Sequence, residues 1–186
     1  QRLNGTSAIL IWETGTERNA IISDVSFADG RITFTTGSKR GNAGIGLLDS
    51  RGECIWSWHI WSVDYDIESS GQTYASGAVF MDRNLGAETT DYTQPASRGL
   101  YYEWGRKDPM IYSSLLREAI WNEPCRGDIT YAPGFEYELC DPKEYSVPYD
   151  VMTIEWSIQH PTWYMYDASF EDWESWESVP DWLYDS

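Results

Sequence analysis

Short apolar runs separated by polar turns dominate the first third of the chain. Each run has the length of a β-strand rather than a helix. Between the second and third runs stands Asp29-Gly30, a dipeptide typical of tight hairpin turns. The glycine-rich stretch Gly41 to Gly46 lacks the spacing of a phosphate-binding loop and is predicted to be a hairpin turn entering a strand. The five predicted strands are Ser7–Trp12, Ala20–Phe27, Arg31–Thr36, Ala43–Leu48 and Glu53–Trp61.

The last of these strands alternates in a way that indicates cover on both faces. Strict alternation places every second side chain on the same face of a strand. One face takes Cys54, Trp56, Trp58 and Ile60, and the other takes Ile55, Ser57, His59 and Trp61. Because both sets are largely apolar or aromatic, residues 1–63 are expected to form an antiparallel, sandwich-like β unit.

The remainder of the chain is predicted to be a mixed region with short helices. Residues 64–76 are polar and are expected to be a connection, and residues 77–186 begin with a short strand, Ala78–Met81. Helices are predicted over Ser113–Trp121 and Val151–His160. The second is expected to be capped by Asp150, to have Val151, Ile154 and Ile158 along one face, and to stop at Pro161. Residues 124–148 contain four prolines and are interpreted as an insertion loop. The fold class is therefore β-rich α+β.

The net charge and the hydropathy of the chain disfavour two classes of partner, nucleic acids and membranes. The formal net charge is -17 and the isoelectric point is about 4.3. An acidic surface repels phosphate backbones, so nucleic-acid binding is disfavoured. No segment is long and apolar enough to predict membrane insertion. The chain starts at Gln1 without Met, which predicts a processed or excerpted piece of a longer protein.

Candidate catalytic and cofactor chemistry is sparse. The two histidines, His59 and His160, lie near no Gly-x-Ser-x-Gly elbow, and carboxylate pairs in so acidic a chain carry little weight. No cofactor is therefore predicted. The motif from Asp64 through Asp66 to Glu68 begins like an EF-hand but departs from it later, which leaves an irregular structural Ca²⁺ site as an alternative.

Cysteines and aromatic residues supply the remaining candidates. Cys125 and Cys140 flank a loop and are the predicted disulfide, whereas Cys54 is expected to be a buried thiol. Aromatic residues make up 16 % of the chain, with 11 Trp. A core role for the late aromatics is favoured, but they also have the composition of a sugar-stacking platform. These candidate ligand residues are Trp163, Tyr164, Tyr166, Trp173 and Trp176.

Three blocks of sequence resemble one family. The blocks run from Trp56 to Trp61, from Met81 to Ala87 and from Gly99 to Pro109. Together they resemble Bacteroidetes surface proteins of the fimbrillin-associated and "major paralogous domain" (Fibrobacter succinogenes) type. The resemblance implies scaffold roles for Trp56, Trp58, His59, Trp61, Asp82, Arg83, Asn84, Trp104, Gly105 and Arg106.

The resemblance also implies a location and a function. It implies a C-type-lectin-like second half, incomplete here because the family's later Cys-Pro and Gly-Trp segment is absent. We expect a secreted or lipid-anchored, non-catalytic adhesion module on a bacterial surface, such as a fimbrial tip, with a glycan or a host protein as ligand and pilus subunits as further partners. The alternatives are a phage receptor-binding protein and an enzyme of the glycosidase or formylglycine-generating type.

Overall fold

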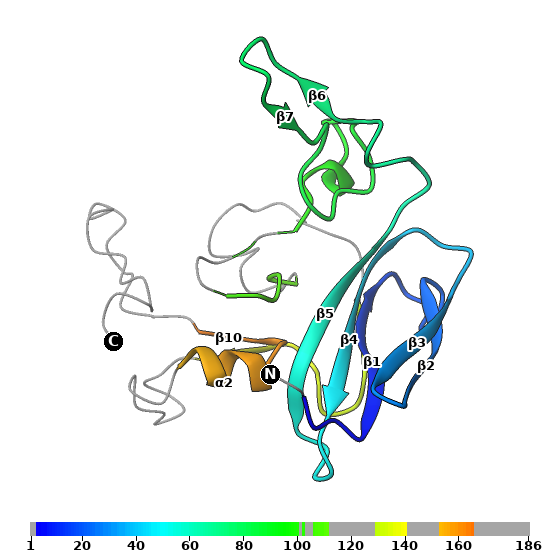
Figure 1. The fold of residues 1–186 in the computed structure, drawn as a ribbon, viewed down its shortest axis with the longest axis vertical. Coiled ribbons are helices and arrows are strands. Elements are labelled where there is room, and N and C mark those ends of the chain that lie inside the picture. The colour runs from blue at the N-terminus through cyan, green and yellow to red at the C-terminus, as the bar shows by residue number, and fades with distance from the viewer. Residues whose placement is uncertain (1–2, 101, 103–105, 112–128, 141–152, 166–186) are drawn as a thin grey trace.

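The computed structural model describes residues 3–100, 102, 106–111, 129–140 and 153–165 (Figure 1). The described part is mostly β-sheet with little helix, which confirms the β-rich fold class. Its strands are β1 Ser7–Thr14, β2 Ile22–Ala28, β3 Arg31–Thr36, β4 Gly41–Leu48, β5 Cys54–Ser62, β6 Gln72–Thr73, β7 Val79–Phe80, β8 Ile129–Tyr131, β9 Glu138–Cys140 and β10 Trp163–Met165. The helices are the 3-10 turn η1 Pro95–Ser97 and the α-helix α2 Ile154–Gln159.

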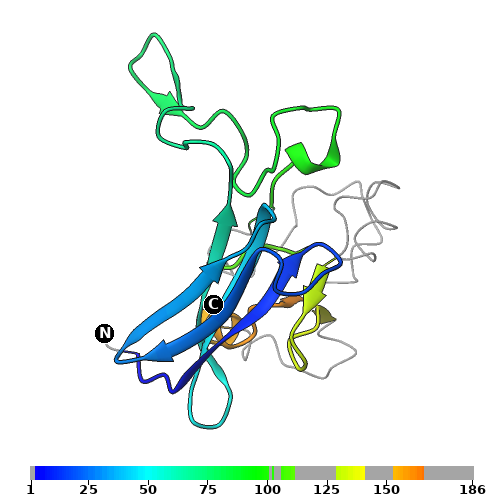
Figure 2. The same ribbon diagram turned by 90° about the vertical axis from the view of Figure 1, so that its right-hand side faces the viewer.

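The centre of the molecule is a four-stranded antiparallel sheet. Its strand order is β5-β4-β1-β8. The hairpin β2–β3 lies over one face of this sheet, as Figure 2 shows from the side. Its turn uses Asp29 and Gly30, both at positive φ, so the Asp-Gly hairpin predicted from the sequence is present. Two further short pairs, β6–β7 and β9–β10, lie outside the main sheet.

Two apolar clusters pack against the two faces of the sheet. The cluster beneath the hairpin combines residues of β1, β2 and β4, namely Ala8, Leu10, Ile21, Ile22, Ala43 and Ile45. The cluster on the opposite face takes up side chains from later in the chain, with Ile11, Trp12, Leu48, Cys54, Leu100 and Ile111 as its buried members. Strand β1 therefore contributes to both clusters, which explains why its sequence is nearly continuously apolar.

A β-bulge places Cys54 on the opposite face of β5 from the one predicted, which it was expected to share with Ile60. The register pairs Leu47 with Trp56 but Leu48 with Cys54, so Ile55 is an extra residue. One extra residue reverses the side-chain alternation beyond it. Cys54 therefore lies in the cluster opposite the hairpin, whereas Ile60 packs beneath the hairpin.

Other local expectations also need correction. The glycine-rich stretch is part of strand β4 itself and not a turn before it. The segment 124–148, expected to be a loop, contains two strands, of which β8 pairs with β1. Helix α2 is capped by the side chain of Thr153 and not by Asp150, and Ser157 is buried in it. The predicted helix Ser113–Trp121 lies outside the described residues.

Candidate functional site

A chain of hydrogen bonds runs through His59 of β5. Its Nε2 lies 2.9 Å from Asn42 Oδ1, and its Nδ1 lies 3.0 Å from the hydroxyl of Tyr102. Because Asn42 Nδ2 donates to the Gly86 carbonyl at 3.0 Å, its Oδ1 is the acceptor that faces the imidazole. Nε2 therefore carries the proton, and the Tyr102 hydroxyl donates to Nδ1. The Trp12 indole stacks on the imidazole at 6.0 Å between ring centroids.

Asn42 joins the sheet to the loop that follows β7. Its side chain is fully buried, and its Nδ2 also lies 3.4 Å from Glu88 Oε1. Its backbone N–H donates to Thr14 Oγ1, which in turn lies 3.5 Å from the same Glu88 oxygen. A buried amide with this number of partners fixes a loop against a sheet. The geometry supports a positioning role for His59 and Asn42.

The Asp82, Arg83 and Asn84 block also makes contacts within the fold. Arg83 donates to both carboxylate oxygens of Asp82, at 2.8 and 2.9 Å, and its guanidinium lies 3.5 Å from the centre of the Tyr65 ring. These hydrogen bonds hold the pKa of Asp82 below its usual value. Asn84 Nδ2 donates to the Arg98 carbonyl at 3.2 Å.

The Arg106 to Asp108 segment anchors β5 and the end of helix α2. Arg106 donates to the carbonyls of His160 and Pro161, each at 3.1 Å. Lys107 donates to the carbonyl and hydroxyl of Ser57 and to Asp108 Oδ2, the last at 2.7 Å. A Ser beside a Lys is one form of activated nucleophile. Here Ser57 and Asp108 are both buried, and the network holds β5 against the segment 106–108.

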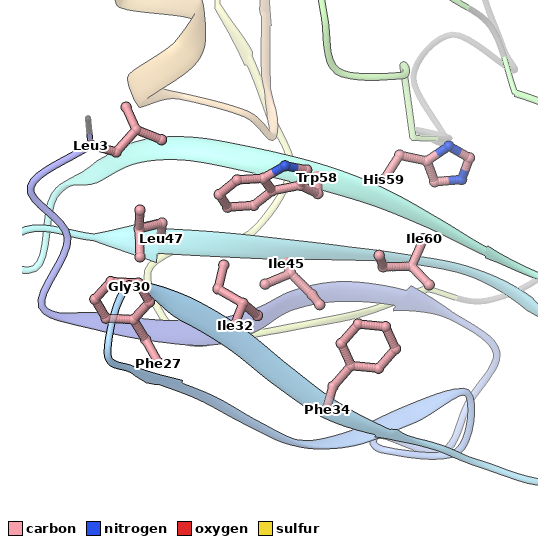
Figure 3. Close-up of a pocket in the computed structure, with 10 residues that line it drawn as sticks. All are labelled: Leu3, Phe27, Gly30, Ile32, Phe34, Ile45, Leu47, Trp58, His59 and Ile60. Atoms are coloured by element: carbon pink, nitrogen blue, oxygen red, sulfur yellow. The ribbon is translucent and has the colours of Figure 1, made fainter. Parts of the chain in front are cut away.

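A concave surface lies between the hairpin and the sheet (Figure 3). We call it the groove. It has a volume of about 490 Å³ and is lined by Leu3, Phe27, Gly30, Ile32, Phe34, Ile45, Leu47, Trp58, His59 and Ile60. None of these residues is acidic, and the imidazole of His59 points away from the other side chains. The groove therefore presents hydrocarbon and aromatic surface to a ligand.

Three large side chains on the open side of the groove are exposed. Leu3 and Phe34 are each 38 % exposed, and Trp58 of β5 is 37 % exposed. Strand β2 makes the contacts of the hairpin with the sheet, mainly through β1, whereas β3 has few contacts with any strand of the sheet and so stands away from it. The side chains of β3 and β5 consequently face each other across a gap that they do not fill. This gap gives the described part of the chain a site large enough for several apolar side chains.

The late aromatic residues are only partly described. Trp163 is half-buried and packs against Trp156 and His160, with ring centroids 6.2 and 5.0 Å apart. This packing resembles a small core more than an open sugar platform. Tyr164 belongs to strand β10, but its side chain lies outside the described part. Tyr166, Trp173 and Trp176 lie outside it altogether, as do Trp104 and Gly105 of the family motif.

The remaining expectations concern sulfur, metals and membranes. Cys54 is a buried free thiol, whereas Cys125 and the side chain of Cys140 lie outside the described residues, so their disulfide stays a prediction. Within the described ranges, no three His, Cys, Asp or Glu side chains gather as metal ligands, and the Ca²⁺ site stays a prediction. The same ranges contain no helix of sufficient length and hydropathy to cross a membrane.

Sequence reasoning identified the strands of the groove but not the groove itself. The alternation of Ile32 and Phe34 with threonines places both side chains on one face of β3. The height of the hairpin above the sheet has no local signal, so the gap could not be predicted. Comparisons with protein-family models, curated proteins and solved structures found no match to this chain.

Proposed function

We propose that this chain is a non-catalytic, extracytoplasmic binding module of a bacterial surface protein, and that its ligand is a protein rather than a glycan. The observation that carries the proposal is the groove between Phe34 and Trp58, with its volume of about 490 Å³. The three sequence blocks that resemble Bacteroidetes surface proteins support the cell-surface location.

The chemistry of the lining favours a protein ligand. A sugar stacks one face on an aromatic ring, but its hydroxyls require Asp, Asn, Glu or similar partners close to that ring. The lining offers aliphatic and aromatic side chains instead. Extended peptide segments with alternating apolar side chains suit such a surface because they bury hydrocarbon at about 25 cal/mol per Å².

The polar networks support a non-catalytic role. His59 is bonded at both ring nitrogens to groups of the protein, and Ser57 is bonded to Lys107 and Asp108. Each of these hydrogen bonds joins a polar side chain to another strand or loop of the chain, which gives that side chain a structural role. Their shared effect is to fix β4, β5 and the following loops relative to one another.

A fluorescent displacement assay tests this proposal. N-phenyl-1-naphthylamine, a neutral apolar probe, should bind the wild-type chain and be displaced by a synthetic peptide of alternating Val, Thr and Phe. Mannose, galactose and cellulose oligosaccharides should leave the probe bound. The variant Phe34→Asp should weaken probe binding by about tenfold or more, because a carboxylate would be desolvated in the groove.

The matched control is Thr35→Asp, which places the same charge on the opposite face of β3. This variant should bind the probe as the wild-type chain does. Equal probe binding by all three proteins would refute the groove as the site. Displacement by an oligosaccharide but not by the peptide would overturn the choice of a protein ligand.

A further inference from the structure

The hairpin β6–β7 forms an apolar projection at the far end of β5. Residues 69–81 contain no charged side chain, although 23 % of the chain is charged. Val79 is 65 % exposed and Phe80 is 60 % exposed, with Tyr74 and Met81 also exposed. Figures 1 and 2 both show this hairpin extending away from the sheet and from the hairpin β2–β3. We call it the arm.

The arm is ordered despite its exposure. Gln72 pairs with Phe80 and Thr73 with Val79, and the Tyr74 N–H donates to the Ala78 carbonyl at 2.9 Å. The Tyr74 and Phe80 rings meet edge to face at 5.3 Å. A defined hairpin that holds large apolar side chains in water is typical of a contact surface rather than a linker.

Charge singles out the surfaces through which two copies can meet. Residues 1–62 carry six basic and six acidic side chains, so the whole net charge of -17 comes from residues 63–186. Two copies therefore repel each other over most of their second halves. The arm is the longest run without a charged residue in that half, and the groove belongs to the electroneutral β unit.

We propose that the arm of one molecule inserts Phe80, with the neighbouring ring of Tyr74, into the groove of a second copy. The inference rests on the proposed function, because it names the occupant of the same groove. Since arm and groove are different surfaces of one chain, the contact is heterologous and extends into head-to-tail chains rather than closed symmetric dimers. A hairpin in a groove of about 490 Å³ is a small interface, so association is weak and depends on concentration.

Sedimentation velocity of the full chain over a range of concentrations tests this inference. The wild-type chain should form oligomers that lengthen with concentration. Phe80→Asp places a charge on the arm and Phe34→Asp places a charge in the groove. In each variant alone, the association constant should fall by about tenfold or more. The matched control is Tyr92→Asp, which adds the same charge at a 90 % exposed aromatic ring outside both surfaces and should associate as the wild type does.

Mixing the two defective variants gives the sharpest result. The arm variant retains an intact groove and the groove variant retains an intact arm, so the mixture should form a one-to-one heterodimer that does not extend. Phe80→Ser and Phe34→Ser repeat the test without added charge and guard against misfolding. Continued association of either single variant, or a mixture that stays monomeric, would overturn the inference.

Probe binding separates this inference from the proposed function. Phe80→Asp should bind N-phenyl-1-naphthylamine as the wild type does, because its groove is unchanged. If the wild-type groove binds the probe and the peptide but the chain is monomeric at every concentration, the groove is a protein-binding site and the self-association is wrong. If the wild-type chain binds neither, the proposed function itself fails.

Discussion

At the scale of single residues, two glycines of β4, Gly44 and Gly46, leave room for large side chains of β1. A Cβ at Gly44 would lie 2.2 Å from the Trp12 indole nitrogen, and a Cβ at Gly46 would lie 2.7 Å from a methyl carbon of Ile11. Glycine is unfavourable in a strand because of its backbone entropy. Here the absence of a Cβ at both positions allows the buried side chains of Trp12 and Ile11 to pack directly against β4.

This packing predicts that Gly44→Ala destabilises the chain. The added methyl group must displace the buried ring of Trp12, and overpacking of this kind costs about 1–3 kcal/mol. Urea unfolding followed by tryptophan fluorescence should show the loss of stability. The control Thr35→Ala removes atoms from an exposed position and should change the free energy of unfolding by about 0.5 kcal/mol or less. An unchanged midpoint for Gly44→Ala would show that Trp12 can move at no cost.

Cys54 gives a prediction in the alkaline range. Burial raises the pKa of its thiol to about 11, against a reference value of 9.0. The native state therefore keeps a proton that the unfolded chain releases, so this group stabilises the fold below pH 9.0 and its contribution is lost as the pH rises toward about 11. The wild-type chain should accordingly lose more stability over this window than Cys54→Ala, in urea unfolding at each pH. Parallel curves would contradict the stated burial of the thiol.

At the scale of elements, local sequence predicted what local contacts determine. The Asp29-Gly30 turn and the alternation in β3 identified the hairpin, because the turn requires positive φ at two adjacent positions and the strand needs one apolar face. Strand β8 was missed because its partner β1 lies more than a hundred residues earlier in the chain. The three residues of β8 are too few for their hydrophobic pattern to predict pairing with so distant a strand.

The same limit explains the errors in the candidate site. Helix α2 begins after Thr153, whose side chain accepts from the N–H of Trp156, whereas Asp150 is as suitable a residue type for a cap at an earlier start. The groove depends on the distance between β3 and β5, which is set by the packing of β2 on β1. The polar partners of His59 come from Asn42 and Tyr102, which stand far from it in the sequence.

The hairpin turn should control both stability and the groove. Gly30 has φ +74 and lines the groove, so Gly30→Ala forces a side chain into the left-handed region at a cost of about 1–2 kcal/mol. Probe binding should weaken together with stability, since β3 forms one wall of the groove. The control Asp29→Asn keeps a residue type that tolerates positive φ and should preserve both properties. If Gly30→Ala lowers stability but leaves probe binding unaltered, the turn does not determine the shape of the groove and the prediction is wrong.

At the scale of the whole molecule, the chain combines an electroneutral β unit with a strongly acidic remainder. The hydrogen bonds from His59 to Tyr102, from Asn42 to Gly86 and from Lys107 to Ser57 join the two parts, so the charged region is held against the neutral one. Acidity of this degree favours solubility and opposes the association of like copies. Any self-contact must then use surfaces where charge is absent.

Salt dependence distinguishes an apolar self-contact from an ionic one. Between about 0.01 M and about 1 M NaCl the screening length falls from about 30 Å to about 3 Å, which removes most of the repulsion between two chains of net charge -17. Burial of Phe80 in the groove is not weakened by this screening, so wild-type association should strengthen as salt is added, in sedimentation velocity at fixed protein concentration. Phe80→Asp should stay monomeric at the highest salt, because screening supplies no apolar contact. If association weakens as salt is added, the contact depends on ion pairs. The insertion of the arm into the groove would then be wrong.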